Sequence, residues 1–474
     1  MNHLVNNYRC ERFGDDYFVT TDHGSYCILS EKDLINLKAN KIDDSLKKKL
    51  LKSQIIIDNS NINEAIELTK SRNHFLFSGT SLHIMVVTLR CNMDCVYCHA
   101  SSKKEHKKEY DMDKATAKST VDFIFQSPSN QLTIEFQGGE PVLNWDTLKY
   151  IIGYATDKNK GSGKDLRFSL VTNFESMDRE KMNYLIDNDV SICTSLDGPK
   201  ELHNLNRKKL NGSNHKNVIK WVNLFAQEYE KRGSKKRVDS LVTLTRKSLS
   251  YPKEIIDEYV KLGLKGIHLR FLDKLGVARK AWPGISYSTE EYMNFWKKAV
   301  KYIDELNKKG VEISERMVSL IYNKIASQYD PNYMDMRSPC GAVIGQLAYN
   351  YNGDIYTCDE ARMIGEDVFV LGNVRESNYR DVAGCENAID TINASINDQY
   401  ICDNCAFKPY CGVCPVCNYA YQGSVIGKIP QTDRCKIFKE QFRWVVAERF
   451  INKKDNKKYN GKITKAEEKN QFVP

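Results

Sequence analysis

The chain has 474 residues, of which 41% are hydrophobic and 28% charged, and its formal net charge is +9. This length allows two or three domains with a sizeable core, and the composition is ordinary for a globular protein. No apolar run approaches the roughly 20 residues that a membrane-spanning helix needs. The one clear excess of charge is a run of lysines after residue 452, which we interpret as a solvated tail and not as a nucleic-acid-binding arm.

The first residues lack the basic start and apolar core of a signal peptide, so we expect a cytoplasmic protein. In that compartment thiols stay reduced, so the 15 cysteines of the chain indicate metal binding instead of disulfides. Three of them fall within residues 91–98, and most of the others lie between residues 340 and 435. This clustering strengthens the prediction of metal.

Residues 1–78 are expected to form a small α+β module. A hairpin, two helices and a further strand are predicted at 17–29, 30–37, 43–52 and 54–57. This set of elements is typical of a winged-helix-like module. The edge of a hairpin can pair with an extended peptide, so the module is a candidate peptide-docking site. The alternative is a cap that stabilises the rest of the fold.

From residue 79 to residue 330, short apolar runs alternate with amphipathic helical stretches. The six expected strands are 82–89, 131–137, 166–172, 191–196, 237–243 and 266–272. Six such units in series predict an α/β fold, a parallel sheet curled into a partial (β/α)6 barrel of the TIM type. Sites on such sheets form at the C-terminal ends of the strands.

Residues 331–440 have no regular periodicity and are dense in Cys, Gly, Pro and Asn. Such a segment has little apolar core of its own, so we expect metal to hold it together as a third, cysteine-rich domain. Residues 441–474 are predicted to form a C-terminal helix and the lysine-rich tail.

Cys91, Cys95 and Cys98 follow the first expected strand directly, with the spacing C-x3-C-x2-C. Three thiolates can hold three irons of a [4Fe–4S] cluster and leave the fourth iron open to bind a small molecule and pass it an electron. A second motif, Gln137-Gly-Gly-Glu-Pro141, closes the second strand. Its glycines allow a ligand to approach the backbone closely, and Glu140 can accept a hydrogen bond from an ammonium group. Alone, this second motif could be a simple turn.

The two motifs together resemble those of the radical S-adenosylmethionine (SAM) enzymes, over roughly residues 82–440. The resemblance implies that SAM chelates the open iron, that one electron cleaves its sulfonium C–S bond, and that the resulting 5′-deoxyadenosyl radical abstracts hydrogen from the substrate. It also implies the cofactor contacts Tyr97, Gly138, Gly139, Glu140, Thr172, Asn173, Ser195, Arg207 and Leu272.

In that assignment, Tyr97 and Leu272 lie near the adenine and Ser195 contacts the ribose. Glu140 meets the methionine ammonium, and Arg207 reaches the carboxylate. The alternatives are that the segment 197–199 is only a turn and that Arg207 forms only a surface ion pair.

The C-terminal cysteines resemble the SPASM extension of this family, which binds two auxiliary [4Fe–4S] clusters. By analogy, one auxiliary cluster takes Cys402, Cys405, Cys411 and Cys435. The other takes Cys340, Cys358 and either Cys414 or Cys417, with a fourth cysteine or an open iron, because Pro415 stands where the family spacing has a cysteine. The alternative is a structural zinc ribbon, since paired C-x2-C knuckles also bind zinc.

Asp359 and Glu360 follow Cys358 directly. In the related sulfatase-maturing enzymes an aspartate at this place is a candidate base, so the resemblance makes Asp359 or Glu360 a candidate catalytic residue. A carboxylate beside an anionic cluster should have a raised pKa, which suits proton transfer. The alternative is a solvated pair of acids.

Auxiliary clusters of this kind accompany the modification of peptides and proteins in the family. The segments 24–30, 110–113 and 135–144 resemble those of the His-Xaa-Ser system maturases. We therefore expect a radical SAM maturase that acts on a ribosomally made peptide and takes electrons from a donor such as flavodoxin or ferredoxin. The alternatives are a formylglycine-forming sulfatase maturase, a radical SAM enzyme of small molecules, and a non-catalytic iron–sulfur or zinc protein.

Overall fold

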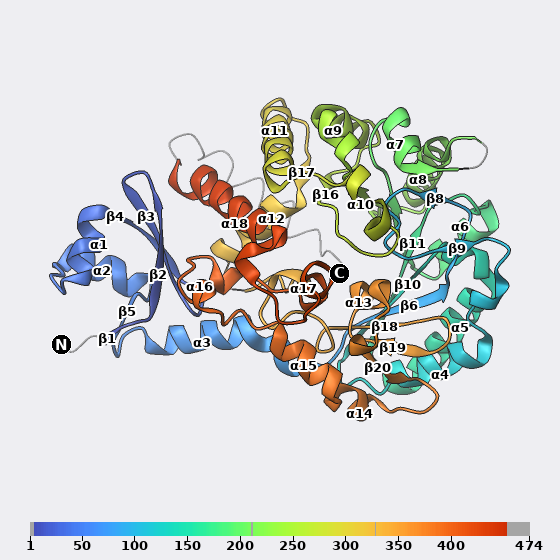
Figure 1. Cartoon of the computed structure of the whole chain (residues 1–474), viewed down its shortest axis with the longest axis horizontal. Coiled ribbons are helices and arrows are strands. Elements are labelled where there is room, and N and C mark those ends of the chain that lie inside the picture. The colour runs from blue at the N-terminus through green and yellow to red at the C-terminus, as the bar shows by residue number, and fades with distance from the viewer. Residues whose placement is uncertain (1–3, 210–211, 328, 453–474) are drawn as a thin grey trace.

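The structure, a computed structural model, describes residues 4–209, 212–327 and 329–452 (Figure 1). At its centre lies a nine-stranded sheet with the strand order β16-β14-β12-β11-β10-β6-β18-β19-β20. The strands are β6 (Leu82–Thr88), β10 (Gln131–Gly138), β11 (Asp165–Thr172), β12 (Ser191–Ser195), β14 (Asp239–Thr243), β16 (Leu269–Arg270), β18 (Gln346–Tyr349), β19 (Asp354–Tyr356) and β20 (Val370–Asn373).

The six expected barrel strands are all present, and their ladders from β6 to β16 are parallel. The predicted partial barrel is therefore confirmed. The last strand differs from the expected 266–272, because Gly266–Ile267 (β15) pairs with Ser314–Glu315 (β17) and only β16 pairs with β14. The Arg270 amide donates to the His268 carbonyl at 2.8 Å, a local turn that interrupts the strand.

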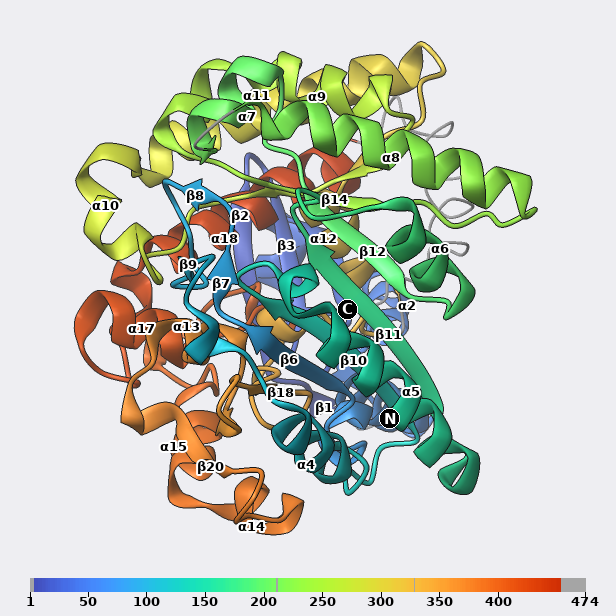
Figure 2. The same cartoon turned by 90° about the vertical axis from the view of Figure 1, so that its right-hand side faces the viewer.

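Amphipathic helices cover the outer face of the barrel strands (Figure 2). The helices of the barrel region are α4 (Lys114–Ile124), α5 (Trp145–Ser162), α6 (Arg179–Asp187), α7 (Lys200–Asn206), α8 (Asn214–Lys231), α9 (Pro252–Lys261), α10 (Ala278–Ile285), α11 (Thr289–Lys308) and α12 (Arg316–Ala326). The predicted apolar stripe of α5 is buried throughout, from Leu148 to Ala155. Each fully buried leucine or isoleucine of this kind stabilises the fold by about 1.5–3 kcal/mol.

The inner face of the barrel is polar. On β12, Ser191, Cys193 and Ser195 are half-buried and alternate with the buried Ile192 and Thr194. Ile192 belongs to the main apolar core, so the other set points to the inside of the barrel. Cys193 is therefore a half-buried thiol on the inner face.

The cysteine-rich region continues the barrel sheet. Strand β18 pairs in parallel with β6, and β19 and β20 extend the sheet by antiparallel pairing. Leu82 and Ile84 of β6 share a second apolar cluster with Tyr356, Phe369 and Val416. The helices of this region are α13 (Asp359–Ile364), α14 (Tyr379–Gly384), α15 (Glu386–Ala394), α16 (Tyr400–Asp403), α17 (Pro415–Gln422) and α18 (Asp433–Val445). Part of its apolar core is thus shared with the barrel, and the boundary expected at residue 331 stays a prediction.

The N-terminal module contains the predicted hairpin and both predicted helices. Its elements are β1 (Leu4–Val5), β2 (Tyr8–Phe13), β3 (Asp16–Thr21), β4 (Tyr26–Ser30), α1 (Glu31–Lys38), α2 (Asp44–Lys52), β5 (Ile56–Ile57) and α3 (Ile62–Asn73). Strands β2, β3 and β4 form an antiparallel sheet with a small apolar core of its own, which includes Val19, Leu29 and Leu50. The sequence patterns did not predict β1, β2 or α3. With them the module has a three-stranded sheet, a two-stranded β1–β5 ladder and three helices.

This module packs against the auxiliary cysteine segment. The Thr20 hydroxyl donates to the Ala406 carbonyl at 2.8 Å, and the Tyr410 hydroxyl donates to the Gly24 carbonyl at 3.0 Å. The rings of Phe18 and Phe407 stack with centroids 6.2 Å apart. The module therefore braces residues 406–410, which lie between the predicted cluster ligands.

Helix α18 and the π-helical turn Val446–Ile451 end the described part of the chain. The predicted lysine-rich tail, from residue 453 on, lies outside the described residues. Within residues 4–209, 212–327 and 329–452, no helix is both long enough and apolar enough to span a bilayer.

Candidate active site

Cys91, Cys95 and Cys98 occupy one loop at the C-terminal end of β6. Arg90–Cys91 (β7) pairs in parallel with Lys103–Lys104 (β9), and Asp94–Cys95 (β8) pairs in antiparallel fashion with Arg207–Lys208 (β13). The Val277 amide donates to the Cys98 carbonyl at 2.8 Å. Each cysteine is thus tied through its backbone to a different segment, at the edge of the sheet where the fold places its sites.

The buried side chain of Arg90 holds this loop in place through hydrogen bonds. Arg90 makes a bidentate contact with Asp111, with both N–O distances at 2.7 Å. Nη1 donates to the Glu105 carbonyl, and Nη2 also donates to the Leu143 carbonyl, both at 3.0 Å. A fork of this kind fixes the guanidinium plane and therefore the backbone next to Cys91. Sequence analysis missed Arg90, although its place directly before Cys91 could have been noticed.

The two glycines of the Gly-Gly-Glu-Pro motif let β10 approach the cysteine loop. The Gly139 and Glu140 amides donate to the Thr88 and Arg90 carbonyls, at 2.8 and 2.7 Å. Gly138 has a φ of +134°, and a Cβ atom there would lie 2.0 Å from the Thr88 carbonyl oxygen. A Cβ atom at Gly139 would lie 2.1 Å from the Arg90 carbonyl oxygen. The sequence suggested a close approach by a ligand, but the group that approaches here is the chain itself.

Glu140 is a buried carboxylate held by three donors. It accepts from the Thr172 hydroxyl at 2.7 Å, from the Asn173 amide at 2.7 Å and from the Val142 amide at 3.2 Å. Burial raises the pKa of Glu140 to about 7, in spite of these donors. Thr172 and Asn173, predicted as cofactor contacts, therefore orient Glu140. The Asn173 side chain also donates to Cys91 Sγ at 3.7 Å.

The role that the resemblance assigns to Glu140, pairing with the SAM ammonium group, predicts that SAM binding depends on pH. Its raised pKa means that the carboxyl group becomes ionised only as the pH rises through about 7, and only the ionised form pairs with an ammonium group. We expect SAM affinity to increase over that interval. The Glu140→Gln substitution should weaken binding above this pH by about ten- to a hundredfold, or about 1.5–3 kcal/mol, and remove the pH dependence. Anoxic equilibrium dialysis measures the SAM affinity and its pH dependence. Equal pH profiles for the wild type and Glu140→Gln would contradict the pairing of Glu140 with the ammonium group.

Tyr97, between the second and third cysteines, belongs to a buried triad. Its hydroxyl donates to the Asp197 carboxylate, with O–O distances of 2.7 and 3.0 Å, and accepts from Arg207 Nη1 at 3.0 Å. Burial raises the pKa of Asp197, and the Arg207 guanidinium opposes that rise. The alternative of a surface ion pair for Arg207 is wrong, because this side chain is buried. Asp197 is also more than a turn residue, since it orients both Tyr97 and Arg207.

A chain of hydrogen bonds connects this triad to the end of β11. The Asp197 amide donates to His203 Nδ1 at 3.2 Å, and His203 Nε2 lies 2.8 Å from Asn214 Oδ1. The Asn214 side chain then donates to the Asn173 carbonyl at 3.0 Å. Burial, together with Arg207, lowers the pKa of His203 to about 3, so the ring is neutral. His203 and Asn214 were not found from the sequence, since no motif marks them.

The side chains present fit the two charged ends of an amino acid. Arg207 Nε is buried and has no hydrogen-bond partner among the described residues. A buried donor without a partner is costly, and a carboxylate placed there would satisfy it. Glu140 supplies the opposite charge for an ammonium group. Ser195 ends β12 half-buried, whereas Leu272 lies beyond β16 and faces the auxiliary cysteines.

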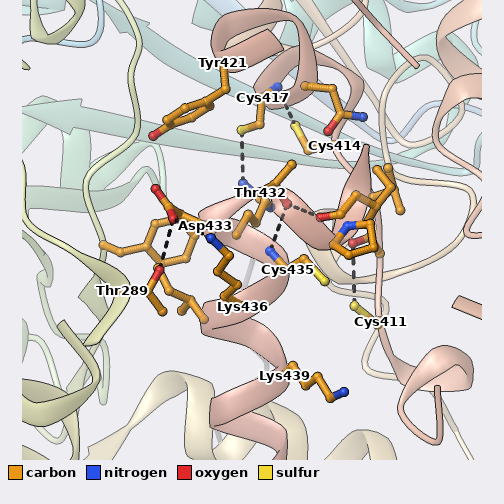
Figure 3. A pocket seen from close by; sticks show the side chains of 18 of the residues that line it. Thr289, Cys411, Cys414, Cys417, Tyr421, Thr432, Asp433, Cys435, Lys436 and Lys439 are labelled. Carbon is orange, nitrogen blue, oxygen red and sulfur yellow. Dashed lines mark hydrogen bonds and ion pairs between the residues drawn. The ribbon is translucent and has the colours of Figure 1, made fainter. Parts of the chain in front are cut away.

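Six of the C-terminal cysteines line one cavity of about 220 Å³ (Figure 3): Cys402, Cys405, Cys411, Cys414, Cys417 and Cys435. In that view Cys414 and Cys417 lie at one end of the cavity, and Cys411 and Cys435 at the other. Burial and then the neighbouring Cys405, Cys435 and Cys402 raise the pKa of Cys411. The structure thus brings together the four cysteines that the resemblance assigned to one auxiliary cluster.

Cys340 and Cys358 form a second group with Cys414. Both are buried in the second apolar cluster, against which Cys414 packs. Burial and then the neighbouring Cys414 raise the pKa of Cys340 to about 12. After burial and Glu360, the same Cys414 contributes to the raised pKa of Cys358. Of the two cysteines left open by the sequence, Cys414 is the one that faces this pair.

Cys417 has different partners. Its thiol donates to Asp273 Oδ1 at 3.8 Å, and Arg434 Nη1 donates to its sulfur at 3.5 Å. The Cys417 amide donates to Cys414 Sγ at 3.4 Å, which places Cys414 at the N-terminus of α17. Cys417 therefore contacts Cys414 through both its amide and its side chain, and its sulfur also accepts from an ion-paired arginine.

A buried arginine, Arg337, also lies near the group formed by Cys340, Cys358 and Cys414. Arg337 stacks on Phe75, with its guanidinium carbon 4.0 Å from the ring centroid, and its Nε and Nη2 have no hydrogen-bond partner among the described residues. Burial lowers the pKa of Arg337 to about 10, and Cys340 opposes that fall. An anionic thiolate-bound cluster would compensate this charge. In the described ranges, no group of three or more His, Cys, Asp or Glu side chains converges on a single metal ion. A [4Fe–4S] cluster instead places each thiolate on its own iron.

The two candidate catalytic acids lie in different surroundings. Asp359 is buried and paired with Arg362, which donates from Nε at 2.9 Å. Glu360 lies 3.6 Å from Arg270 Nη2, a looser pair. Burial and then Asp335 raise the pKa of Glu360 to about 7. The predicted rise in pKa is thus found at Glu360, with burial as its main cause.

Comparison with known proteins places this site in a family. Residues 85–259 match the model of the Radical SAM superfamily. A cysteine-type anaerobic sulfatase-maturating enzyme of Clostridium perfringens is 26% identical over 79% of this chain and 98% of its own length. The radical SAM cyclopropyl synthase TigE of Paramaledivibacter caminithermalis is 22% identical over 79% of this chain and 77% of its own length.

Solved structures share the architecture. Native anSMEcpe with bound AdoMet superposes with a TM-score of 0.64 at 21% identity, covering 79% of this chain and 98% of that chain. Streptococcus suis SuiB bound to the precursor peptide SuiA superposes with a TM-score of 0.54 at 14% identity, covering 90% of this chain and 98% of that chain. Residues 85–259 are thus a radical SAM domain, and the cysteine motifs together with the sulfatase-maturase relatives fit a radical SAM maturase of the SPASM type.

Proposed function

We propose that the enzyme abstracts hydrogen from one residue of a ribosomally made peptide and thereby matures it. The observation that carries this proposal is the combination of the C-x3-C-x2-C loop at the barrel edge with two further cysteine groups in the C-terminal region. One relative is by its name a sulfatase-maturating enzyme, and SuiB, which shares the fold, has been solved bound to its precursor peptide.

We assign the cofactor site as follows. Cys91, Cys95 and Cys98 hold three irons of one [4Fe–4S] cluster, which supplies the electron that cleaves the sulfonium C–S bond of SAM. Glu140 pairs with the SAM ammonium group, and Arg207 pairs with its carboxylate through the unpartnered Nε. Of the further contacts predicted from the resemblance, Tyr97, Gly138, Gly139, Thr172, Asn173 and Ser195 support these groups or contact the nucleoside, whereas Leu272 lines the auxiliary cavity.

Two auxiliary [4Fe–4S] clusters complete the cofactors. We assign Cys402, Cys405, Cys411 and Cys435 to one of them, and Cys340, Cys358 and Cys414 to the other. Glu360 is the better candidate for contact with the substrate, because Asp359 is neutralised by Arg362. A protein donor such as flavodoxin or ferredoxin would supply the electrons.

A direct test uses anoxic enzyme, SAM, dithionite and a peptide encoded beside the gene. We expect 5′-deoxyadenosine to form, its rate to increase with the peptide, and the peptide mass to change in step. Formation of 5′-deoxyadenosine without any response to peptides, but with a response to a small metabolite, would contradict the proposal.

A sulfatase maturase is the second candidate, favoured by the 26% identity with the C. perfringens enzyme over most of both chains. A synthetic sulfatase peptide with a target cysteine separates the two functions. Loss of sulfur and formation of formylglycine on that peptide would establish the second candidate. No reaction there, with modification of the cognate peptide, supports the first.

The peptide is proposed to dock through the N-terminal module, by strand addition at the edge of β4 or β2. Within the described residues, neither edge pairs with a further strand of the chain. Deletion of the module is a poor test, because Thr20 and Tyr410 connect it to the auxiliary segment. Hydrogen exchange is better: full-length precursor should slow exchange of the amides of residues 26–30 or 8–13, and the isolated core peptide should not. Unchanged exchange at saturating precursor would exclude this docking mode.

A further inference from the structure

A largely shielded arginine lies between the two auxiliary cysteine groups. Arg434 is the second residue of α18, and its guanidinium packs against the rings of Phe271 and Phe438, 5.9 and 5.1 Å from their centroids. Only 11% of its side chain is exposed, and its Nε has no hydrogen-bond partner among the described residues. The charge of Arg434 is therefore held in an apolar, poorly hydrated place, where its field acts over a longer range than it would in water.

The side chain of Arg434 lies beside one auxiliary cysteine group, whereas the next residue in sequence, Cys435, belongs to the other group. Cys435 is one of the four cysteines that include Cys402 and Cys411. The side chain of Arg434 instead points to Cys417, whose sulfur lies 3.5 Å from Nη1, and its charge also acts on Cys414. The first turn of α18 thus contributes Cys435 to the group with Cys402 and Cys411, and the positive charge of Arg434 to the group with Cys414.

Two carboxylates balance this cation only loosely. Asp273 lies 4.0 Å from Arg434 Nη1, and Asp335 lies 3.7 Å from Nη2. Asp273 is also engaged by Arg270 at 3.2 Å. At these distances neither carboxylate hydrogen-bonds to the guanidinium, whereas Nη1 lies within hydrogen-bonding distance of the Cys417 sulfur. A fixed positive charge favours the more negative, reduced state of a nearby cluster, because hydrogen bonding and charge near the sulfurs set cluster potentials.

We propose that Arg434 raises the reduction potential of the auxiliary cluster held by Cys340, Cys358 and Cys414, and that Asp273 acts on the same cluster in the opposite direction. This inference rests on the ligand sets assigned above. It gives Arg434 a role that its place in the sequence, directly before a predicted ligand of the other cluster, does not reveal. Electrons entering at the Cys435 cluster would then move toward the cluster beside Arg434.

The test is EPR-monitored potentiometry of anoxically reconstituted full-length protein. Arg434→Met should shift the midpoint potential of one auxiliary cluster downward and leave that of the Cys91 cluster unchanged. Arg434→Lys, which keeps the charge, should stay near the wild-type value, and Asp273→Asn should shift the same potential upward. Arg443→Met is the matched control, since it removes an exposed charge of α18 that is paired with Glu11.

Each outcome has a distinct meaning. Equal potentials in wild type and Arg434→Met, at equal iron content, would overturn the inference and leave the proposed function intact. If Arg434→Met fails to assemble its clusters, Asp273→Asn decides, because an unchanged or lowered potential there also overturns the inference. Absence of both auxiliary signals from the wild type would overturn the inference together with the ligand assignment.

Discussion

Replacement of any one of Cys91, Cys95 or Cys98 by alanine is expected to abolish SAM cleavage. The three cysteines lie in one loop at the barrel edge, and two of them are fixed by short ladders to neighbouring segments. The site has no spare thiol in its sequence neighbourhood, so a cluster with two ligands should not persist. We expect 5′-deoxyadenosine formation to fall by about a thousandfold or more, which corresponds to about 4 kcal/mol or more of the activation barrier.

The control for this experiment is Cys10→Ala, which removes a half-buried thiol from β2, remote in sequence from every assigned ligand. That variant should keep wild-type activity. Iron content and Mössbauer spectra of the three loop variants should show that the auxiliary clusters remain. A loop variant that still cleaves SAM at a rate close to that of the wild type would refute the assignment of the catalytic cluster.

The second large effect is expected from Gly139→Ala. The new methyl group would lie 2.1 Å from the Arg90 carbonyl oxygen and 2.5 Å from that of Leu89, both backbone atoms that cannot rotate away. Either β10 or the cysteine loop must move, and the hydrogen bond from the Glu140 amide to Arg90 would be lost. We expect destabilisation of about 3 kcal/mol or more and loss of SAM binding.

Gly153→Ala is the matched control. Gly153 lies within α5, and a Cβ atom there would meet no atom within 4 Å. Alanine at an open helical position should stabilise the protein by about 0.5–1 kcal/mol. Thermal melts and SAM binding of the two variants can be compared directly. Normal SAM binding by Gly139→Ala would show that the close contact between β10 and the loop is not required.

Much of the barrel could be predicted because its strands are short runs rich in apolar residues that alternate with amphipathic helices. The stripe from Leu148 to Ala155 likewise identified a helix that packs on the sheet. The last strand could not be predicted as it stands, since its residues divide between two partners, β14 and β17. Nor does local pattern reveal that β18 continues the sheet beside β6, because that pairing joins segments more than 250 residues apart.

The candidate site was predictable where the chemistry needs rare residues at fixed spacing. The cysteines and the Gly-Gly-Glu-Pro motif are of that kind. Arg90, Asp197 and Arg434 were missed because a single arginine or aspartate has no distinctive spacing, and its burial is known only from the fold. The choice of Cys414 over Cys417 also needed the structure, since both fit the sequence pattern equally well.

The measurement that tests the central claim most directly is EPR of the reduced protein with and without SAM. It uses a variant in which the auxiliary ligands Cys340, Cys358, Cys402 and Cys405 are replaced, so that only the Cys91 cluster contributes. If that cluster has an iron without a protein ligand, SAM must change its spectrum by binding there. A spectrum that saturating SAM leaves unchanged would contradict the account.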